Sequence, residues 1–237
     1  MPLNFKSKSL DHDLFFEASN ITELPHDNND NRMNAKEKDS IIDIEVANNS
    51  IWREEKTFHV ALVSTFSALS VVLGYMLAYI PNIELFTLFI FMSGFVLSKR
   101  DGFLIGLLSS SIFTFFNPLG ASPPPLFVYQ LIHYSLTGFL GGLIKDFLIK
   151  KTYFKPKEDL YVFQVMILFG IIGGTITFIY DILSTLIGGF LVSMTIEYFL
   201  TSYLTGIIFT LIHLVGNILG FVFILPGLIQ LIIRLID

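Results

Sequence analysis

Long apolar stretches separated by short polar connections occupy the chain from residue 57 to its end. A bilayer core about 30 Å thick requires about 20 residues of helix, because backbone groups inside hydrocarbon must bond to one another. The pattern therefore predicts an all-α protein, a polytopic membrane bundle of six transmembrane helices. The predicted helices cover residues 57–80, 84–97, 102–116, 123–149, 161–187 and 198–225. The second and third are short, which favours thin or tilted helices inside the bundle.

The basic residues after position 50 fall in alternate connections of this pattern. They precede the first helix, separate the second from the third and the fourth from the fifth, and follow the sixth: Arg53, Lys56, Lys99, Arg100, Lys145, Lys150, Lys151, Lys155, Lys157 and Arg234. The connections near Asn82, at 117–125 and at 188–197 contain none. Cytoplasmic connections of membrane proteins are enriched in Lys and Arg, so the pattern predicts six spans in a cell membrane with both termini cytoplasmic. Five or seven spans would scatter these charges over both sides.

The first 50 residues differ from the rest of the chain. They contain ten acidic and five basic residues, and the run from His26 to Asn31 has no periodicity and nothing apolar to bury. Such composition is typical of disorder. We therefore predict a polar, disordered cytoplasmic tail at 1–50 and a six-helix transmembrane domain at 51–237. Within the tail, residues 41–46 could form a short strand or an amphipathic turn.

Composition excludes several functions. The mean hydropathy is +0.67 and 53% of residues are hydrophobic, which is too apolar for a soluble domain. The chain has no Cys, so thiol catalysis, disulfides and Cys-ligated zinc are excluded. It also lacks the phosphate-binding motif of P-loop ATPases and the metalloprotease and serine-hydrolase motifs. We expect no nucleic-acid partner, no metal and no cofactor, and we do not expect an enzyme.

Small residues recur at four-residue spacing in the predicted helices. Gly102 and Gly106, Gly170 and Gly174, and Gly216 and Gly220 form pairs that let helix backbones approach closely, which favours packing within the bundle. The first helix carries a broader small surface. It could pack internally or dock a second membrane protein, and it includes Ala61, Ser64, Thr65 and Ala68.

Polar residues within membrane helices are costly and often mark functional sites. Here most of them lie toward the outer ends of the predicted helices, namely Glu84, Asn117, Gln130, His133, Tyr134, Tyr180 and Asp181. This distribution predicts an outward-facing polar and aromatic pocket. The alternative is a set of interfacial side chains that reach toward water. His213 and Asn217, spaced i and i+4, lie in the inner half of the predicted sixth helix, and we expect them to join it to a neighbour.

The order of these features resembles the S components of energy-coupling factor (ECF) transporters. The resemblance covers about residues 57–232 and rests on Pro81-Asn82-Ile83-Glu84, Asn117-Pro118-Leu119-Gly120, Gly138-x-x-Gly141-Gly142, Tyr180-Asp181 and His213-x-x-x-Asn217. It implies six helices in lipid that hold a vitamin or vitamin precursor near the outer surface, and the pattern is nearest to a branch linked to cobalamin or its precursors. The implied partners are a transmembrane T component, which the small residues of the first helix would contact, and two ABC ATPases.

Two other functions remain open at this point. One is an intramembrane enzyme that uses His133, Asp181 and either Glu84 or Glu197 as an acid–base or metal site. The other is a scaffold without catalytic activity. The sequence does not identify the transported substrate, the role of residues 1–50 or whether the coupling subunits are shared.

Overall fold

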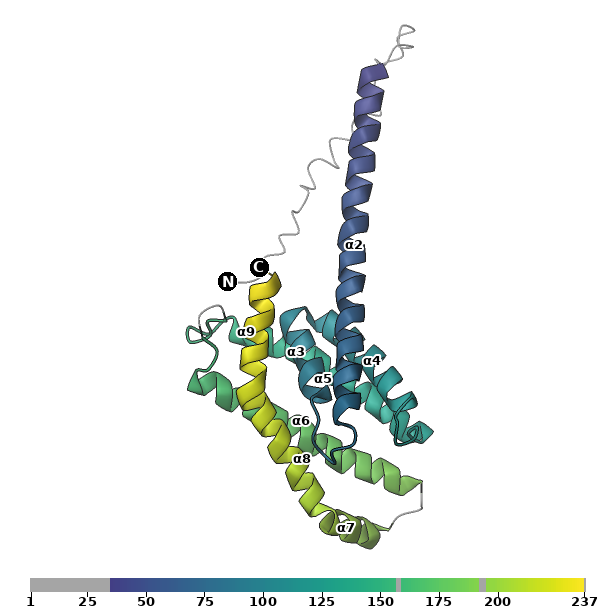
Figure 1. The fold of residues 1–237 in the computed structure, drawn as a ribbon, viewed down its shortest axis with the longest axis vertical. Coiled ribbons are helices and arrows are strands. Elements are labelled where there is room, and N and C mark those ends of the chain that lie inside the picture. The colour runs from purple at the N-terminus through teal and green to yellow at the C-terminus, as the bar shows by residue number, and fades with distance from the viewer. Residues whose placement is uncertain (1–34, 157–158, 192–194, 237) are drawn as a thin grey trace, which may run out of the picture. The chain divides into compact units, whose positions relative to one another are not determined.

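The computed structural model describes residues 35–156, 159–191 and 195–236. Within these ranges the chain is helical, with only an isolated bridge between Lys155 and Asp159 (Figure 1). The elements are α2 (Ala35–Leu77), α3 (Phe86–Val96), α4 (Lys99–Phe115), α5 (Pro124–Leu148), α6 (Phe163–Phe190), α7 (Ile196–Thr205), α8 (Ile207–Leu219), the π-helical turn η2 (Gly220–Ile224) and α9 (Leu225–Ile236). The all-α prediction is confirmed for this part of the chain.

Four of the described helical segments are long and apolar enough to cross a membrane. They are Lys56–Leu77, Pro124–Leu148, Phe163–Phe190 and Ile207–Arg234. This indicates a membrane protein. Helices α3 and α4, with 11 and 17 residues, are shorter, as the sequence predicts. Every residue of α3 is buried, so this helix lies inside the bundle.

The predicted sixth helix, 198–225, is wrong in its bounds. The chain forms the short helix α7, ends it at Gly206 and starts again at Ile207. Glycine stabilises a helix interior less than other residues and is common at helix ends, so position 206 suits this break. The second segment then continues through α8, η2 and α9 to Ile236. The fifth predicted helix ends later than expected, at Phe190, because α6 passes through Gly188.

Helix α2 begins at Ala35, so residues 35–50 of the predicted tail are helical. Residues 1–34 lie outside the described part of the chain. The residues from Ala61 onward form one compact unit, and the packing described below is that of this unit.

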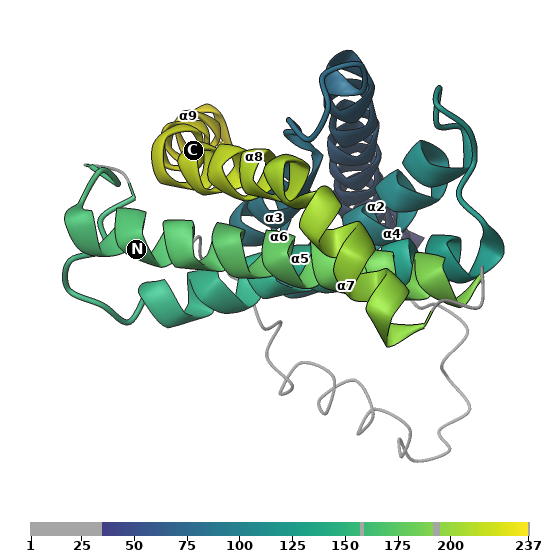
Figure 2. The same ribbon diagram turned by 90° about the horizontal axis from the view of Figure 1, so that it is seen from below.

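Glycines bring α3, α4 and α5 into close contact. A Cβ atom added at Gly94 or Gly102 would overlap the backbone of Gly138, and one added at Gly106 would overlap the backbone of Tyr134. Helix α6 contacts both α5 and α8 (Figure 2). Gly170 and Gly174 on α6 face side chains of the α8–η2 segment, so the glycine pairs of α4 and α6 pack within the bundle as predicted.

A phenylalanine-rich core joins α3 to α6 and η2. The ring of Phe91 lies 5.3 Å from that of Phe221 and 6.3 Å from that of Phe169, and Phe95 lies 5.7 Å from Phe169. Along the α8–η2–α9 segment, buried residues recur at every fourth position: His213, Asn217, Phe221, Leu225 and Ile229.

The turn between α3 and α4 is held by polar contacts. The Lys145 ammonium of α5 donates hydrogen bonds to the carbonyls of Val96 (2.9 Å) and Leu97 (3.2 Å), at the end of α3. The Ser98 hydroxyl caps α4 by accepting a hydrogen bond from the Asp101 backbone N–H. These contacts fix the C-terminal end of α3. The candidate site described below lies at its N-terminal end.

Candidate functional site

The loop between α2 and α3 builds one wall of the site. Backbone hydrogen bonds from Ile80 to Leu77 (2.9 Å) and from Ile83 to Ile80 (3.3 Å) fold it tightly. Asn82 has a φ of 58°, in the left-handed region that Asn tolerates better than most residues. The loop thereby delivers Glu84 to the start of α3.

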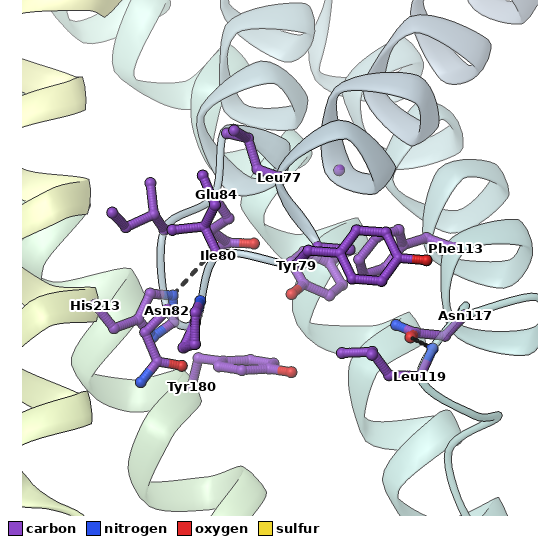
Figure 3. A pocket seen from close by; sticks show the side chains of 15 residues that line it. Leu77, Tyr79, Ile80, Asn82, Glu84, Phe113, Asn117, Leu119, Tyr180 and His213 are labelled. Atoms are coloured by element: carbon purple, nitrogen blue, oxygen red, sulfur yellow. Dashed lines mark hydrogen bonds and ion pairs between the residues drawn. The ribbon is translucent and has the colours of Figure 1, made fainter.

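A cavity of about 610 Å³ lies against this loop (Figure 3). The loop and the end of α2 line it together with residues from α4, the loop that follows α4, α5, α6 and α8. The lining residues are Gly74, Leu77, Ala78, Tyr79, Ile80, Pro81, Asn82, Ile83, Glu84, Phe113, Asn117, Leu119, Tyr134, Tyr180 and His213. Tyr79 is 76% exposed and Leu119 is 71% exposed, so the cavity opens to the surroundings between them.

Two carboxylates and a histidine meet at one side of the cavity. The His213 imidazole places Nδ1 2.8 Å from Asp181 Oδ1 and Nε2 3.3 Å from Glu84 Oε1. Thr87 also donates a hydrogen bond to Glu84 Oε1, and Asn217 Nδ2 lies 3.4 Å from the same oxygen. The side chains of His213, Asp181 and Glu84 are 9%, 14% and 21% exposed. We call Glu84, Asp181 and His213 the carboxylate–histidine cluster; it joins the loop, α6 and α8.

Aromatic rings form the adjoining wall. The Tyr180 ring lies 5.7 Å from that of Tyr134 and 5.0 Å from the His133 imidazole. The Tyr134 ring meets Phe86 edge-on, and Phe86 stacks on Phe113 at 4.5 Å. The wall thus runs across α3, α4, α5 and α6.

Three buried polar atoms behind this wall have no hydrogen-bond partner within the described residues: Gln130 Oε1, His133 Nε2 and Asp181 Oδ2. The amide of Gln130 does bond through its other atom, because Nε2 donates to the Tyr180 hydroxyl at 2.8 Å. Buried polar atoms usually have a partner, so a group of three beside a cavity is unusual.

The predicted site residues divide into two sets. Glu84, Asn117, Tyr134 and Tyr180 line the cavity. The other three do not line the cavity but contact residues that do. Gln130 and His133 contact Tyr180, and Asp181 contacts His213.

The sequence predicts His213 in the inner half of the last helix, away from the other polar residues, and that placement is wrong. Because the helix restarts at Ile207, His213 lies in its second turn, at the level of the cavity, and lines it. It does also join α8 to α6 and to the loop, as predicted. Its i, i+4 spacing with Asn217 and the glycine at 206 were the signals in the sequence.

The predicted docking residues lie on one face of α2. Ala61, Ser64, Thr65 and Ala68 are all exposed. The opposite face packs against the bundle and buries Val63, Phe66, Ser67, Ser70 and Val71. The small surface is therefore not used for packing within residues 61–236.

Glu197, named for the enzyme alternative, is exposed on α7, apart from the carboxylate–histidine cluster. Among the described residues, no group of three His, Cys, Asp or Glu side chains is placed to hold a metal ion. The arrangement of His213 between two carboxylates suits proton transfer or the binding of a polar ligand.

Searches of protein-family models, curated proteins and solved structures find no significant match to this chain. The fold and the site therefore define its class by themselves: a helical membrane protein with a partly open cavity that is lined by aromatic side chains and a carboxylate–histidine cluster.

Proposed function

We propose that this chain captures a small, partly aromatic nutrient at the outer face of a cell membrane and acts as the substrate-binding subunit of an ECF-type importer. The observation that carries the proposal is the cavity of about 610 Å³ beside the loop between α2 and α3. Ligand sites are concave, mostly apolar and equipped with a few polar groups, and volumes of about 300–1,000 Å³ suit a drug-sized molecule.

The distribution of charge supports a position at the outer face. Six spans with both termini cytoplasmic would place every basic connection on the inner side. The cavity lies with the other connections, beside Asn82 and Asn117, where no Lys or Arg occurs. A nutrient would then reach it from outside.

The size of the cavity bears on the ligand. A cobalamin-related compound is the favoured assignment from the sequence pattern. An intact corrinoid is far larger than the drug-sized molecules that cavities of this volume enclose, so the volume favours a small aromatic precursor over the complete vitamin.

The exposed small face of α2 supports the proposed partners. Small residues let a second helix approach closely in lipid, and Ala61, Ser64, Thr65 and Ala68 form such an exposed surface on α2. We assign it to a transmembrane T component that is driven by two ABC ATPases. The chain itself has no P-loop motif for ATP hydrolysis.

Purification and uptake test the proposal. The full chain, purified in detergent from cells grown in rich medium, should retain a small molecule that mass spectrometry detects after denaturation. Cells that express the chain with a T component and the two ATPases should import that molecule. A chain that retains nothing and supports no uptake would contradict the proposal.

Docking can be tested separately from capture. Ala68→Trp should abolish uptake and leave ligand retention unchanged, because Ala68 is exposed and does not line the cavity. Ile171→Trp is a matched control, since Ile171 is 62% exposed on α6. Normal uptake by Ala68→Trp would remove this face as the docking surface.

The carboxylate–histidine cluster favours a second candidate, an intramembrane acid–base enzyme. An imidazole 2.8 Å from a carboxylate is a common arrangement for a general base. In this hypothesis the catalytic histidine is His213 instead of His133. The enzyme hypothesis predicts that the purified chain chemically converts its bound molecule and that His213→Gln stops the conversion. A ligand that remains unchanged after long incubation would contradict the enzyme hypothesis.

A further inference from the structure

Acidic side chains outnumber basic ones at the cavity. Among the described residues no Lys or Arg lines it, Glu84 lies on its wall, and Asp181 contacts His213. The cluster combines two carboxyl groups with one imidazole, so the groups that can carry negative charge outnumber the one that can carry positive charge. Inside a low-dielectric bundle such a charge is screened weakly, so it discriminates strongly between ligands of opposite sign.

The Glu84 carboxylate has one oxygen in use and one free. Thr87, His213 and Asn217 all contact Oε1. Within the described part of the chain, Oε2 takes part in no hydrogen bond, and it is not among the buried polar atoms that lack a partner. Figure 3 shows Glu84 and His213 joined by a dashed line at the side of the pocket. Oε2 is therefore available to a ligand, while Oε1 holds the side chain in place.

Aromatic faces lie next to this carboxylate. Tyr180 and Tyr134 line the cavity with ring centroids 5.7 Å apart, and Phe113 lines it from α4. Aromatic faces attract cations, and rings of this kind bind organic cations in proteins. Gln130 Oε1 and Asp181 Oδ2, both acceptors without a partner among the described residues, add to the negative potential behind the rings.

We propose that this cavity takes a flat, positively charged nitrogen heterocycle, which lies against the aromatic side chains with its charged edge toward Glu84 Oε2. The proposal names the ligand class of the capture site and so rests on the proposed function. It excludes carboxylated and phosphorylated ligands, because among the described lining residues the one side chain that can be cationic is His213, and two carboxylates already contact it.

Three probes of matched shape test the ligand class. N-methylquinolinium is a flat cation, methylnaphthalene is its neutral isostere, and naphthoate carries the opposite charge. Each is titrated calorimetrically into the full purified chain, with detergent alone as the blank. N-methylquinolinium should bind about tenfold or more tightly than methylnaphthalene, and naphthoate should show no saturable binding.

Two variants test whether the preference for a cation depends on the negative charge at the cavity wall, one at Glu84 and one at Asn117. Glu84→Gln keeps an acceptor oxygen toward Thr87 but loses the charge, so the preference for the cation over its neutral isostere should shrink to the part that the aromatic rings supply. Asn117→Asp adds a carboxylate on the opposite wall and retains an acceptor for the Leu119 N–H, so it should tighten binding of the cation alone.

The titrations of the unmodified chain decide the outcome without either variant. Equal or tighter binding of methylnaphthalene, saturable binding of naphthoate, or no saturable binding of N-methylquinolinium at millimolar concentration would overturn the ligand class. Retention and uptake of a neutral or anionic nutrient would also overturn it while leaving the capture function intact. Failure to retain or import any small molecule would instead contradict the capture function itself.

Discussion

Asp181 illustrates how one side chain can belong to a site without reaching its ligand. Flanked by apolar residues in a membrane helix, it needs a hydrogen bond, and His213 Nδ1 supplies one at 2.8 Å. The sequence predicts the carboxylate's importance but offers two partners for it, a ligand or a neighbouring side chain. In the structure Asp181 Oδ1 bonds to the neighbouring side chain of His213, and Asp181 is not among the described residues that line the cavity.

Replacing Asp181 with Asn should therefore lower stability first. The change exchanges a charged acceptor for a neutral one opposite His213, and we expect the free energy of unfolding to fall by about 1–2 kcal/mol. Thermal unfolding in detergent measures this, with Glu197→Gln on the exposed face of α7 as the control. Probe affinity should fall less than in Glu84→Gln. Unaltered stability with a large loss of affinity would place Asp181 in direct contact with the ligand.

Tyr180 separates the contribution of a ring from that of its hydroxyl. Tyr180→Phe removes the acceptor of the 2.8 Å hydrogen bond from Gln130 and leaves a buried amide unpaired, which should cost about 1–3 kcal/mol of stability. The ring remains, so the affinity for N-methylquinolinium should change little. Tyr180→Leu removes the ring and should weaken binding of the cation by about tenfold. Calorimetric titration of both variants checks this; equal affinities would show that the ring does not contact the ligand.

At the scale of helices, periodicity identifies surfaces but not their partners. Gly102 and Gly106 are spaced for close packing, yet nothing in α4 specifies that its neighbour is α5 at Gly138 and Tyr134. The ends of helices were predictable to within three residues where Pro or Asn ends an apolar run: α2 ends at Leu77 against a predicted Ile80, and α4 ends at Phe115 against a predicted Phe116. They were not predictable at Gly188 and Gly206, because glycine occurs inside helices as well as at their ends: α6 passes through Gly188, whereas α7 ends before Gly206.

Gly138 and Gly188 form a matched pair of alanine substitutions. A methyl group at Gly138 would overlap the backbone of Gly102, which cannot move aside like a flexible side chain, so Gly138→Ala should destabilise the protein by about 1–3 kcal/mol or more. At Gly188 nothing lies within 4 Å of an added Cβ, and Gly188→Ala should leave stability unchanged or raise it by up to about 1 kcal/mol. Thermal unfolding of the two variants in detergent distinguishes them; similar values would contradict the close contact of α4 with α5.

For the whole molecule, alternation of the helices explains why distant residues converge. Successive helices run in opposite directions, so the end of one helix lies at the same height as the start of the next. This alternation brings four predicted residues to one cavity: Glu84, Asn117, Tyr134 and Tyr180. The sequence predicts a helix that begins at residue 198 and so places His213 too deep, whereas α8 begins at Ile207. Nine residues of α-helix span about 14 Å along the axis, which is enough to move a side chain from one half of a bilayer to the other.

The predicted topology can be checked directly, since the chain has no native Cys. Single cysteines at Arg100, Ala121, Lys150 and Leu191, all exposed, should react with a membrane-impermeant maleimide from inside, outside, inside and outside. Leu191 is the suitable position at this connection, because α6 extends to Phe190 and contains Gly188 and Gly189. Labelling of Lys150→Cys from outside intact cells would contradict six spans with cytoplasmic termini.

The π-helical turn η2 sets the rotational phase between the two ends of the last long helix. In a regular α-helix each residue advances about 100°, so positions four apart drift about 40° and a run of five such positions turns through about 160°. His213, Asn217, Phe221, Leu225 and Ile229 are nonetheless all buried. A π turn accommodates one extra residue, which reduces this rotation by about 100°. Deleting one residue within Gly220–Ile224 would therefore turn α8 against α9, and either His213 would leave Glu84 or Leu225 and Ile229 would leave the core.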